Sequence, residues 1–153
     1  MALYYLDTSA LVKLYVREPG TDQMIRLAST SSGHTLSVIS LARVEFRAAV
    51  RKRERTGDVP HEMAEALIAR MERHWPDLYL VQPVTEAVVE EAAALLDRHP
   101  LKAYDAMQLA GCLSLRSRLP ERPSFVCSDR QLLRAAQAEG LTAVNPVASP
   151  VPA

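Results

Sequence analysis

Apolar residues along the chain fall into short runs, separated by longer stretches in which they recur with helical spacing. The short runs, typical of buried strands, lie at residues 3–6, 35–39, 78–81, 124–127 and 141–144. Helices are expected at residues 10–15, 22–29, 41–55, 60–75, 85–98, 102–119 and 129–139. This alternation predicts an α/β fold with a doubly wound, parallel sheet of about five strands and helices on both faces.

Capping and helix-breaking residues support these boundaries. Thr85 is a favourable cap for the helix that follows it, and Gly140 is expected to end the helix before it. Pro60 suits the first turn of a helix, whereas Pro76 and Pro83 are expected to bound the third strand. We see no internal repeat and no linker in the sequence, so a single domain is expected.

The composition is that of a globular protein. Of the 153 residues, 48% are hydrophobic and 24% are charged, which is enough to build a core without disulfides or a structural metal. We expect one domain over residues 1–146. Because three prolines follow Asn145, residues 147–153 are expected to form a flexible tail.

We expect neither a targeting signal nor a reactive cysteine pattern in this sequence. The chain opens without a basic leader followed by an apolar segment, and its charge-free stretches are too polar to span a bilayer. We therefore expect a cytoplasmic protein with no membrane contact. Cys112 and Cys127 stand in apolar surroundings without a CxxC pattern, so both are expected to be buried, free thiols.

The net charge is zero, from 18 basic and 18 acidic residues. A tight, non-specific nucleic-acid binder usually carries a basic excess, so an RNA-binding function must explain how a neutral protein approaches a polyanion. Four arginines recur at a spacing of four and form a basic stripe: Arg43, Arg47, Arg51 and Arg55. This stripe is either a solvated helix face or a contact for RNA phosphates or an acidic partner.

A second stripe with helical spacing is apolar and consists of Met63, Leu67, Met71 and Trp75. Such a stripe usually belongs to the core. A protein–protein groove is the alternative, because Met and aromatic side chains are enriched at interfaces. The sequence leaves both interpretations open.

Four acidic residues are candidates for chemistry. Asp7 and Asp129 each follow a predicted strand, at the edge where open parallel sheets bind ligands. Glu45 lies on an apolar helix face, where an unpaired carboxylate is costly to bury. Asp105 lies near the start of an otherwise apolar helix. Each also has a structural explanation, as a helix cap, as a partner of the helix dipole or as a solvent-exposed side chain.

Considered together, the four carboxylates predict a metal site. Repulsion among close anions would raise their pKa values, so a cluster without a cation is unfavourable. Mg²⁺ prefers carboxylate oxygens and water, and Mn²⁺ is an alternative. Such a site suits phosphodiester hydrolysis. The cations would also screen the acidic pocket from the RNA backbone.

At these residues the sequence resembles the PIN-domain ribonucleases, in particular the VapC-type toxins of bacterial and archaeal toxin–antitoxin pairs. The similarity covers residues 3–146. Four motifs stand in the family's order: YLDTSALVKLY at 5–15, SLARVEFRAA at 40–49, LKAYDAMQLA at 101–110 and FVCSDRQLL at 125–133. The resemblance implies a PIN-like, three-layer α/β/α fold and a Mg²⁺-dependent ribonuclease.

The resemblance also implies roles for the four acids. Asp7 and Asp105 would be the principal metal ligands. Glu45 would be a ligand or would hold a metal-bound water. Asp129 would complete the pocket or bind a second ion. All four are therefore candidate catalytic and metal-binding residues.

Hydroxyl groups, basic groups and partners follow from the same resemblance. The hydroxyl residues that would position the phosphate or the carboxylates are Thr8, Ser9 and Ser128. The candidate contacts to RNA or to an antitoxin are Arg43, Arg47 and Arg51. The implied partners are an RNA substrate, a cognate antitoxin whose tail occupies the pocket or the groove beside it, and a second copy of the chain in a homodimer.

Three other functions are possible in principle. An aspartyl-phosphate phosphatase would use Asp7 as its nucleophile, but it usually carries a second aspartate two residues later, where this chain has Ser9. A phosphate-accepting receiver domain would require a lysine at a late strand end, and residues 124–129 contain none. A non-catalytic RNA-binding or scaffold PIN domain would have no reason to keep the acids grouped.

Overall fold

The computed structural model describes residues 2–148, and its five strands form one all-parallel sheet in the order β3-β2-β1-β4-β5. The strands are β1 (Leu3–Leu6), β2 (Thr35–Ile39), β3 (Tyr79–Gln82), β4 (Ser124–Val126) and β5 (Thr142–Val144). The predicted α/β class and the parallel sheet are thus confirmed.

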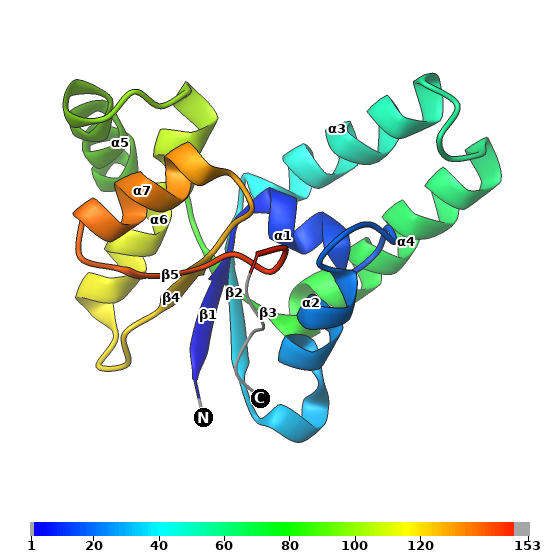
Figure 1. Cartoon of the computed structure of the whole chain (residues 1–153), viewed down its shortest axis with the longest axis horizontal. Coiled ribbons are helices and arrows are strands. Elements are labelled where there is room, and N and C mark those ends of the chain that lie inside the picture. Colours follow the sequence, from blue (N-terminus) through cyan, green and yellow to red (C-terminus); the bar gives the residue numbers. More distant parts are fainter. Residues whose placement is uncertain (1, 149–153) are drawn as a thin grey trace.

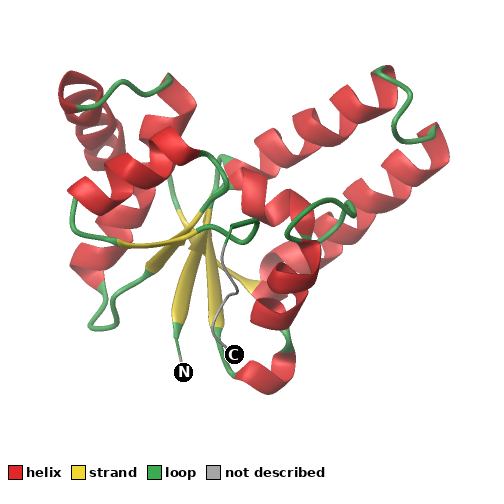
Figure 2. Cartoon of the chain, viewed as in Figure 1, coloured by secondary structure: helices red, strands yellow, loops and turns green. Residues whose placement is uncertain are grey.

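Helices cover both faces of this sheet. They are α1 (Thr8–Lys13), α2 (Thr21–Ala28), α3 (Ala42–Arg55), α4 (His61–Leu78), α5 (Glu86–Arg98), α6 (Ala103–Arg118) and α7 (Arg130–Ala138), with a short 3-10 helix at Thr30–Ser32. Helices α1 to α4 lie on one side of the strands and α5 to α7 on the other, which gives three layers (Figures 1 and 2). Helices α3 and α4 form a hairpin that projects away from the sheet (Figure 1).

Two predicted proline boundaries are corrected. Helix α4 continues through Pro76 to Leu78, so Pro76 does not bound the third strand. A proline removes one helical hydrogen bond, and this close to the helix end the remaining turns tolerate the loss. Pro60 lies one residue before α4 in an extended conformation, with ψ of 154°, rather than inside the first turn.

Other local predictions are confirmed. The Oγ1 atom of Thr85 accepts a hydrogen bond of 3.2 Å from the backbone N–H of Val88 and caps α5. Gly140 follows α7 with a φ of +81°, a conformation that favours glycine and ends the helix. Cys112 and Cys127 are both buried and free.

The core surrounds the central strands. All four residues of β1 are buried, and Tyr5 stacks on Phe125 of β4 with 5.7 Å between the ring centroids. Strands of a parallel sheet with helices on both faces are buried on both sides, which explains why β1 is a continuous apolar run.

The strand order reverses at β1. The chain proceeds from β1 to β2 and β3 on one side, and then crosses the sheet to place β4 and β5 on the other. Leu6 at the end of β1 pairs with Val126 at the end of β4. Open α/β sheets bind ligands beside the carboxyl ends of the strands at such a switch point, so the residues just after β1 and β4 are the first place to look for a site.

The domain limit at residue 146 stays a prediction. Most of the expected tail, residues 149–153, lies outside the described residues. Within residues 2–148, no helix is both long enough and apolar enough to cross a bilayer.

Candidate active site

Two of the predicted acids flank the switch point of the sheet. Asp7 directly follows β1, and its backbone N–H donates a hydrogen bond of 3.0 Å to the carbonyl of Val126 on β4. Asp129 lies three residues after the end of β4 and precedes α7. The other two acids, Glu45 and Asp105, lie in the first turns of α3 and α6.

Asp7 is a buried carboxylate, 7% exposed. Its Oδ2 atom accepts hydrogen bonds from the hydroxyl (2.7 Å) and the backbone N–H (3.4 Å) of Ser9, so Asp7 also caps α1. Burial raises the pKa of Asp7, and the hydrogen bonds from Ser9 oppose this shift.

Glu45 is partly buried and is held by one of its two oxygens. Its Oε1 atom accepts hydrogen bonds from Oγ1 of Thr8 (3.1 Å) and from Nε2 of Gln108 (2.8 Å). Burial raises the pKa of Glu45, and the negative charges of Asp7 and Asp105 raise it further, against the hydrogen bonds.

Asp105 lies in the same electrostatic environment. Burial raises its pKa most, followed by the charges of Asp7 and Asp129. Three of the acids therefore interact electrostatically with at least two of the other three. The positive end of α6, where Asp105 is placed, favours its ionised form.

Asp129 is exposed, and its Oδ1 atom accepts a hydrogen bond of 2.9 Å from the backbone N–H of Leu132. This is the helix-capping role that the sequence left open. Its connection to the other acids is the effect of its charge on Asp105.

The acids are thus neighbours without forming a ready-made ligand set. In residues 2–148 no group of three or more His, Cys, Asp or Glu side chains lies in an arrangement that would hold a metal ion. Asp7, Glu45, Asp105 and Asp129 also form no ion pair with a described basic residue. Lys102 is the one positive charge that lowers the pKa of Asp105, and it does not outweigh burial and the charges of Asp7 and Asp129, which raise that pKa.

The predicted hydroxyl residues lie around the carboxylates. The hydroxyl of Thr8 donates to Glu45 and that of Ser9 donates to Asp7, so both bond to carboxylates. The backbone N–H of Ser128 donates a hydrogen bond of 3.4 Å to the Ser9 hydroxyl, which connects the loop after β4 to the start of α1.

Gln108 and Cys127 contact the site, although the sequence had not indicated them. Gln108 is 1% exposed and lies one helical turn after Asp105. This spacing places both residues on the same face of the helix, and it is the sequence feature that could have indicated Gln108. Cys127 is buried as predicted, and its Sγ atom also accepts a hydrogen bond of 3.2 Å from the backbone N–H of Asp129. No sequence pattern indicated that contact.

The basic stripe on α3 is largely paired with glutamates. Arg43 and Arg47 both form ion pairs with Glu72 of α4, the latter at 3.7 Å. Arg51 pairs with Glu54 at 2.8 Å and also with Glu65 of α4. Most of the charge that the sequence places on this face is therefore offset by acids on the neighbouring helix or one turn away.

The apolar stripe on α4 is divided between core and surface. Met71 is fully buried, Leu67 and Trp75 are partly buried against the core, and Met63 is 52% exposed. The core interpretation is therefore confirmed for Met71, Leu67 and Trp75, whereas the protein–protein groove stays a prediction.

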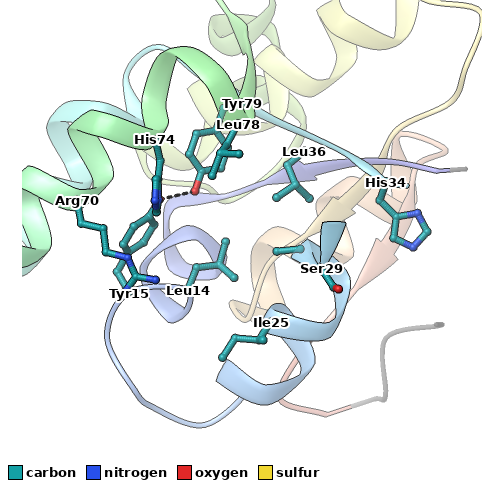
Figure 3. A pocket seen from close by; sticks show the side chains of 11 residues that line it. Leu14, Tyr15, Ile25, Ser29, His34, Leu36, Arg70, His74, Leu78 and Tyr79 are labelled. Atoms are coloured by element: carbon teal, nitrogen blue, oxygen red, sulfur yellow. Dashed lines mark hydrogen bonds between the residues drawn. The ribbon is translucent and has the colours of Figure 1, made fainter. Parts of the chain in front are cut away.

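A pocket of about 450 Å³ lies beside α1, between α2, β2 and α4 (Figure 3). Its polar centre is Tyr15, whose hydroxyl is 2.7 Å from the hydroxyl of Tyr79 and 2.9 Å from Nδ1 of His74. The exposed apolar side chains of Ile25 and Leu78 also line the pocket. None of the four acids lines it, and α1 runs from Asp7 at its start to the pocket residues Leu14 and Tyr15 just after its end.

Known proteins with similar sequences and structures identify the family. Residues 4–138 match the PIN domain. The chain is 34% identical over 147 residues to "Ribonuclease VapC45" of Mycobacterium tuberculosis, covering 92% of this chain and 93% of that protein. The fold resembles the crystal structure of FitAcB from Neisseria gonorrhoeae, with a TM-score of 0.68, 16% identity, and coverage of 97% and 100% of the two chains. It also resembles VapBC2 from Rickettsia felis bound to a promoter DNA fragment, with a TM-score of 0.64, 12% identity, and coverage of 94% and 98%. The chain therefore belongs to the PIN-domain family, and within it to the VapC group.

Proposed function

We propose that this chain is an endoribonuclease that hydrolyses RNA phosphodiester bonds with Mg²⁺ or Mn²⁺, and that it is the toxin of a toxin–antitoxin pair. The observation that carries the proposal is the group of electrostatically coupled carboxylates at the switch point of the sheet, none of which forms an ion pair with a described basic residue. The chain's relatives in the VapC group carry the name ribonuclease, which supports the same reaction.

The donor chemistry of these side chains suits a hard divalent cation, and ligation would require the carboxylates to move closer together than they lie in residues 2–148. All four candidate donors are carboxylates, whose oxygens Mg²⁺ prefers, and their mutual repulsion is a cost that a cation would remove. Asp7 and Asp105 would be the principal ligands, with Glu45 and Asp129 completing the site. When bound, the metal supplies charge neutralisation and Lewis acidity toward the phosphodiester.

The chain's own side chains would orient the reactants and accept a proton. Within residues 2–148, Oε2 of Glu45 carries no hydrogen bond, so this atom is available to accept a proton from the attacking water. Asp7 is buried and bonded to Ser9, a poor environment for a nucleophile. This disfavours the aspartyl-phosphate phosphatase.

The direct experiment uses purified protein and a labelled single-stranded RNA of mixed sequence. We expect cleavage in Mg²⁺ or Mn²⁺ and none in EDTA, and we expect Asp105→Asn to remove cleavage in either metal. Cleavage that survives EDTA would exclude the metal mechanism. Normal cleavage by Asp105→Asn would show that the site is misassigned. Tight RNA binding without cleavage would instead favour the non-catalytic PIN scaffold.

We further propose that the pocket beside α1 binds apolar side chains of an antitoxin (Figure 3). One solved structure with this fold is a toxin–antitoxin complex from Klebsiella pneumoniae. The pocket combines exposed apolar side chains, Ile25 and Leu78, with aromatic and arginine side chains, a composition typical of interfaces. Helix α1 spans only about 9 Å, so a segment anchored in the pocket could extend over the acids.

Expression in a bacterial host tests this partner. We expect growth arrest that is relieved by co-expression of the adjacent upstream open reading frame. Leu78→Glu should preserve RNA cleavage and lose neutralisation. Val89→Glu on α5, a comparably exposed apolar position on the other face, is the control and should still be neutralised. Neutralisation of Leu78→Glu would exclude the pocket. The homodimer stays a prediction that light scattering of the purified protein checks.

A further inference from the structure

Three side chains from three helices close a hydrogen-bonded triangle at the edge of the acidic site. Nε2 of Gln108 on α6 donates to Oγ1 of Thr8 at 2.9 Å and to Oε1 of Glu45 at 2.8 Å. The Thr8 hydroxyl, at the start of α1, donates to the same Oε1 atom at 3.1 Å. Helices α1 and α3 cover one face of the sheet and α6 covers the other, so the triangle joins the two helical layers.

The donors of this triangle are fully used. A glutamine amide has two N–H groups, and both have partners here, while the Thr8 hydroxyl uses its single proton on Glu45. The carbonyl oxygen of the same amide, Oε1 of Gln108, contributes no stabilising hydrogen bond, because it is buried without a partner among the described residues. A leucine or methionine would fill this volume without burying an unpaired carbonyl. The two hydrogen bonds that the Gln108 amide donates, to Thr8 and to Glu45, are therefore the interactions that an apolar residue at this position could not make.

Both hydrogen bonds to Glu45 end on one oxygen. Oε1 is occupied by Thr8 and Gln108, whereas Oε2 carries no hydrogen bond within residues 2–148. The carboxylate thus has one held oxygen and one free oxygen. Because Gln108 lies one turn after Asp105 on the same helix, the bond also sets Glu45 relative to the helix that carries Asp105.

We propose that Gln108 is a positioning residue, which together with Thr8 holds Oε1 of Glu45 so that Oε2 alone is presented to the divalent cation or to water. This inference rests on the proposed metal-dependent function. Neighbours that orient metal ligands commonly change metal affinity or activity by roughly 10–100-fold when they are mutated. Gln108 would act through Glu45 and would not touch the RNA.

The test is a Mn²⁺ titration of the full chain, followed by electron paramagnetic resonance, with RNA cleavage measured in parallel. We expect Gln108→Leu to weaken Mn²⁺ binding roughly 10-fold or more and to lower kcat with little change in KM. Thr8→Val should also weaken Mn²⁺ binding, whereas Thr8→Ser keeps the hydroxyl that bonds to Glu45 and should retain the wild-type affinity.

Gln82 on β3 offers a matched control. It is also 1% exposed, and its amide bonds to Arg118 and to the carbonyl of Pro83 rather than to the acids. Gln82→Leu removes a buried glutamine of the same size and should leave Mn²⁺ affinity unchanged. If Gln108→Leu fails to fold in thermal melting, the Thr8→Val and Thr8→Ser pair carries the test.

A double-mutant cycle separates positioning from general loosening of the site. In a Glu45→Gln background, Gln108→Leu should have no further effect on Mn²⁺ affinity, because its route of action is already removed. Equal Mn²⁺ affinity in wild type and Gln108→Leu would overturn this inference and leave the proposed function standing. So would an undiminished effect in the Glu45→Gln background. The metal mechanism itself would be overturned if the wild type showed no saturable Mn²⁺ binding, or if its Mn²⁺ binding were unchanged in Asp105→Asn.

Discussion

The phenol oxygen of Tyr5 on β1 lies against the backbone of α6 at Gly111, in the space that a Cβ atom on residue 111 would occupy. The side chain of Ile39 closes the same space, with its Cδ1 atom 3.0 Å from the Cβ position. The Tyr5 hydroxyl is fully buried and has no hydrogen-bond partner among the described residues. Helix α6 therefore packs on the sheet only because residue 111 has no side chain.

Gly111→Ala should destabilise the chain by roughly 1–3 kcal/mol, the usual cost of overpacking a core. Alanine's better helix propensity offsets only about 1 kcal/mol of strain. Tyr5→Phe should be neutral or stabilising, because it removes an unpaired buried hydroxyl, and it should rescue much of the Gly111→Ala defect. Urea unfolding of the two single variants and the double variant checks this. Equal losses for Gly111→Ala in both backgrounds would mean that the hydroxyl is not the obstacle.

Asp7→Asn should stabilise the metal-free chain near neutral pH. Burial raises the folded-state pKa of Asp7, so the buried carboxyl is most favourable when protonated. The native state therefore loses stability as pH rises from about the ordinary value of 3.8 through the raised pKa. Asparagine keeps a polar cap for α1 and carries no charge.

The measurement is the thermal midpoint of wild type and Asp7→Asn in EDTA across pH 3.5 to 8. The variant's advantage should grow with pH and vanish at the acid end, where both side chains are neutral. Each kcal/mol corresponds to roughly 2–4 °C for a chain near this size. Addition of Mg²⁺ should raise the midpoint of the wild type more than that of the variant. A pH-independent difference would show that charge burial is not its cause.

Glu72→Gln should strengthen the binding of single-stranded RNA by releasing Arg43 and Arg47, which both pair with Glu72. In a plot of the logarithm of the binding constant against the logarithm of the salt concentration, each additional phosphate contact makes the slope steeper by about 0.7 for single strands. Binding of an RNA to a non-cleaving Asp105→Asn background at several salt concentrations measures both quantities. An unchanged affinity and slope would assign the basic stripe to the solvated surface.

Neither cysteine should react with a thiol reagent in the folded chain at pH 8. Cys112 and Cys127 are buried, and burial raises the pKa of both thiols well above the ordinary range, so little thiolate is present. Ellman's reagent should label both residues only after urea unfolding. Rapid labelling of Cys127 alone would indicate that the loop around Asp129 opens readily.

Local features of the fold were predictable because they depend on neighbouring residues. The apolar runs indicated the strands, the Thr85 cap and Gly140 indicated helix limits, and the placement of Asp7 after β1 followed from where an apolar run ends. Pro76 was misjudged for the same reason. Its local effect is to break a helix, and the actual end of α4 two residues later depends on how the helix meets the sheet.

The sequence by itself thus determined the order of strands and helices, the buried thiols and the four acids at element ends. Only the tertiary structure decided which side chains meet. Thr8 and Gln108 stand 100 residues apart and share a hydrogen bond, and Arg43 is paired by Glu72 on another helix. Such contacts depend on the strand order and on which face each crossover covers. Hydrophobic spacing shows which face of a helix or strand is buried, but it does not show which other helix or strand packs against that face. The sequence pattern therefore cannot identify pairs of contacting residues that lie far apart in the chain.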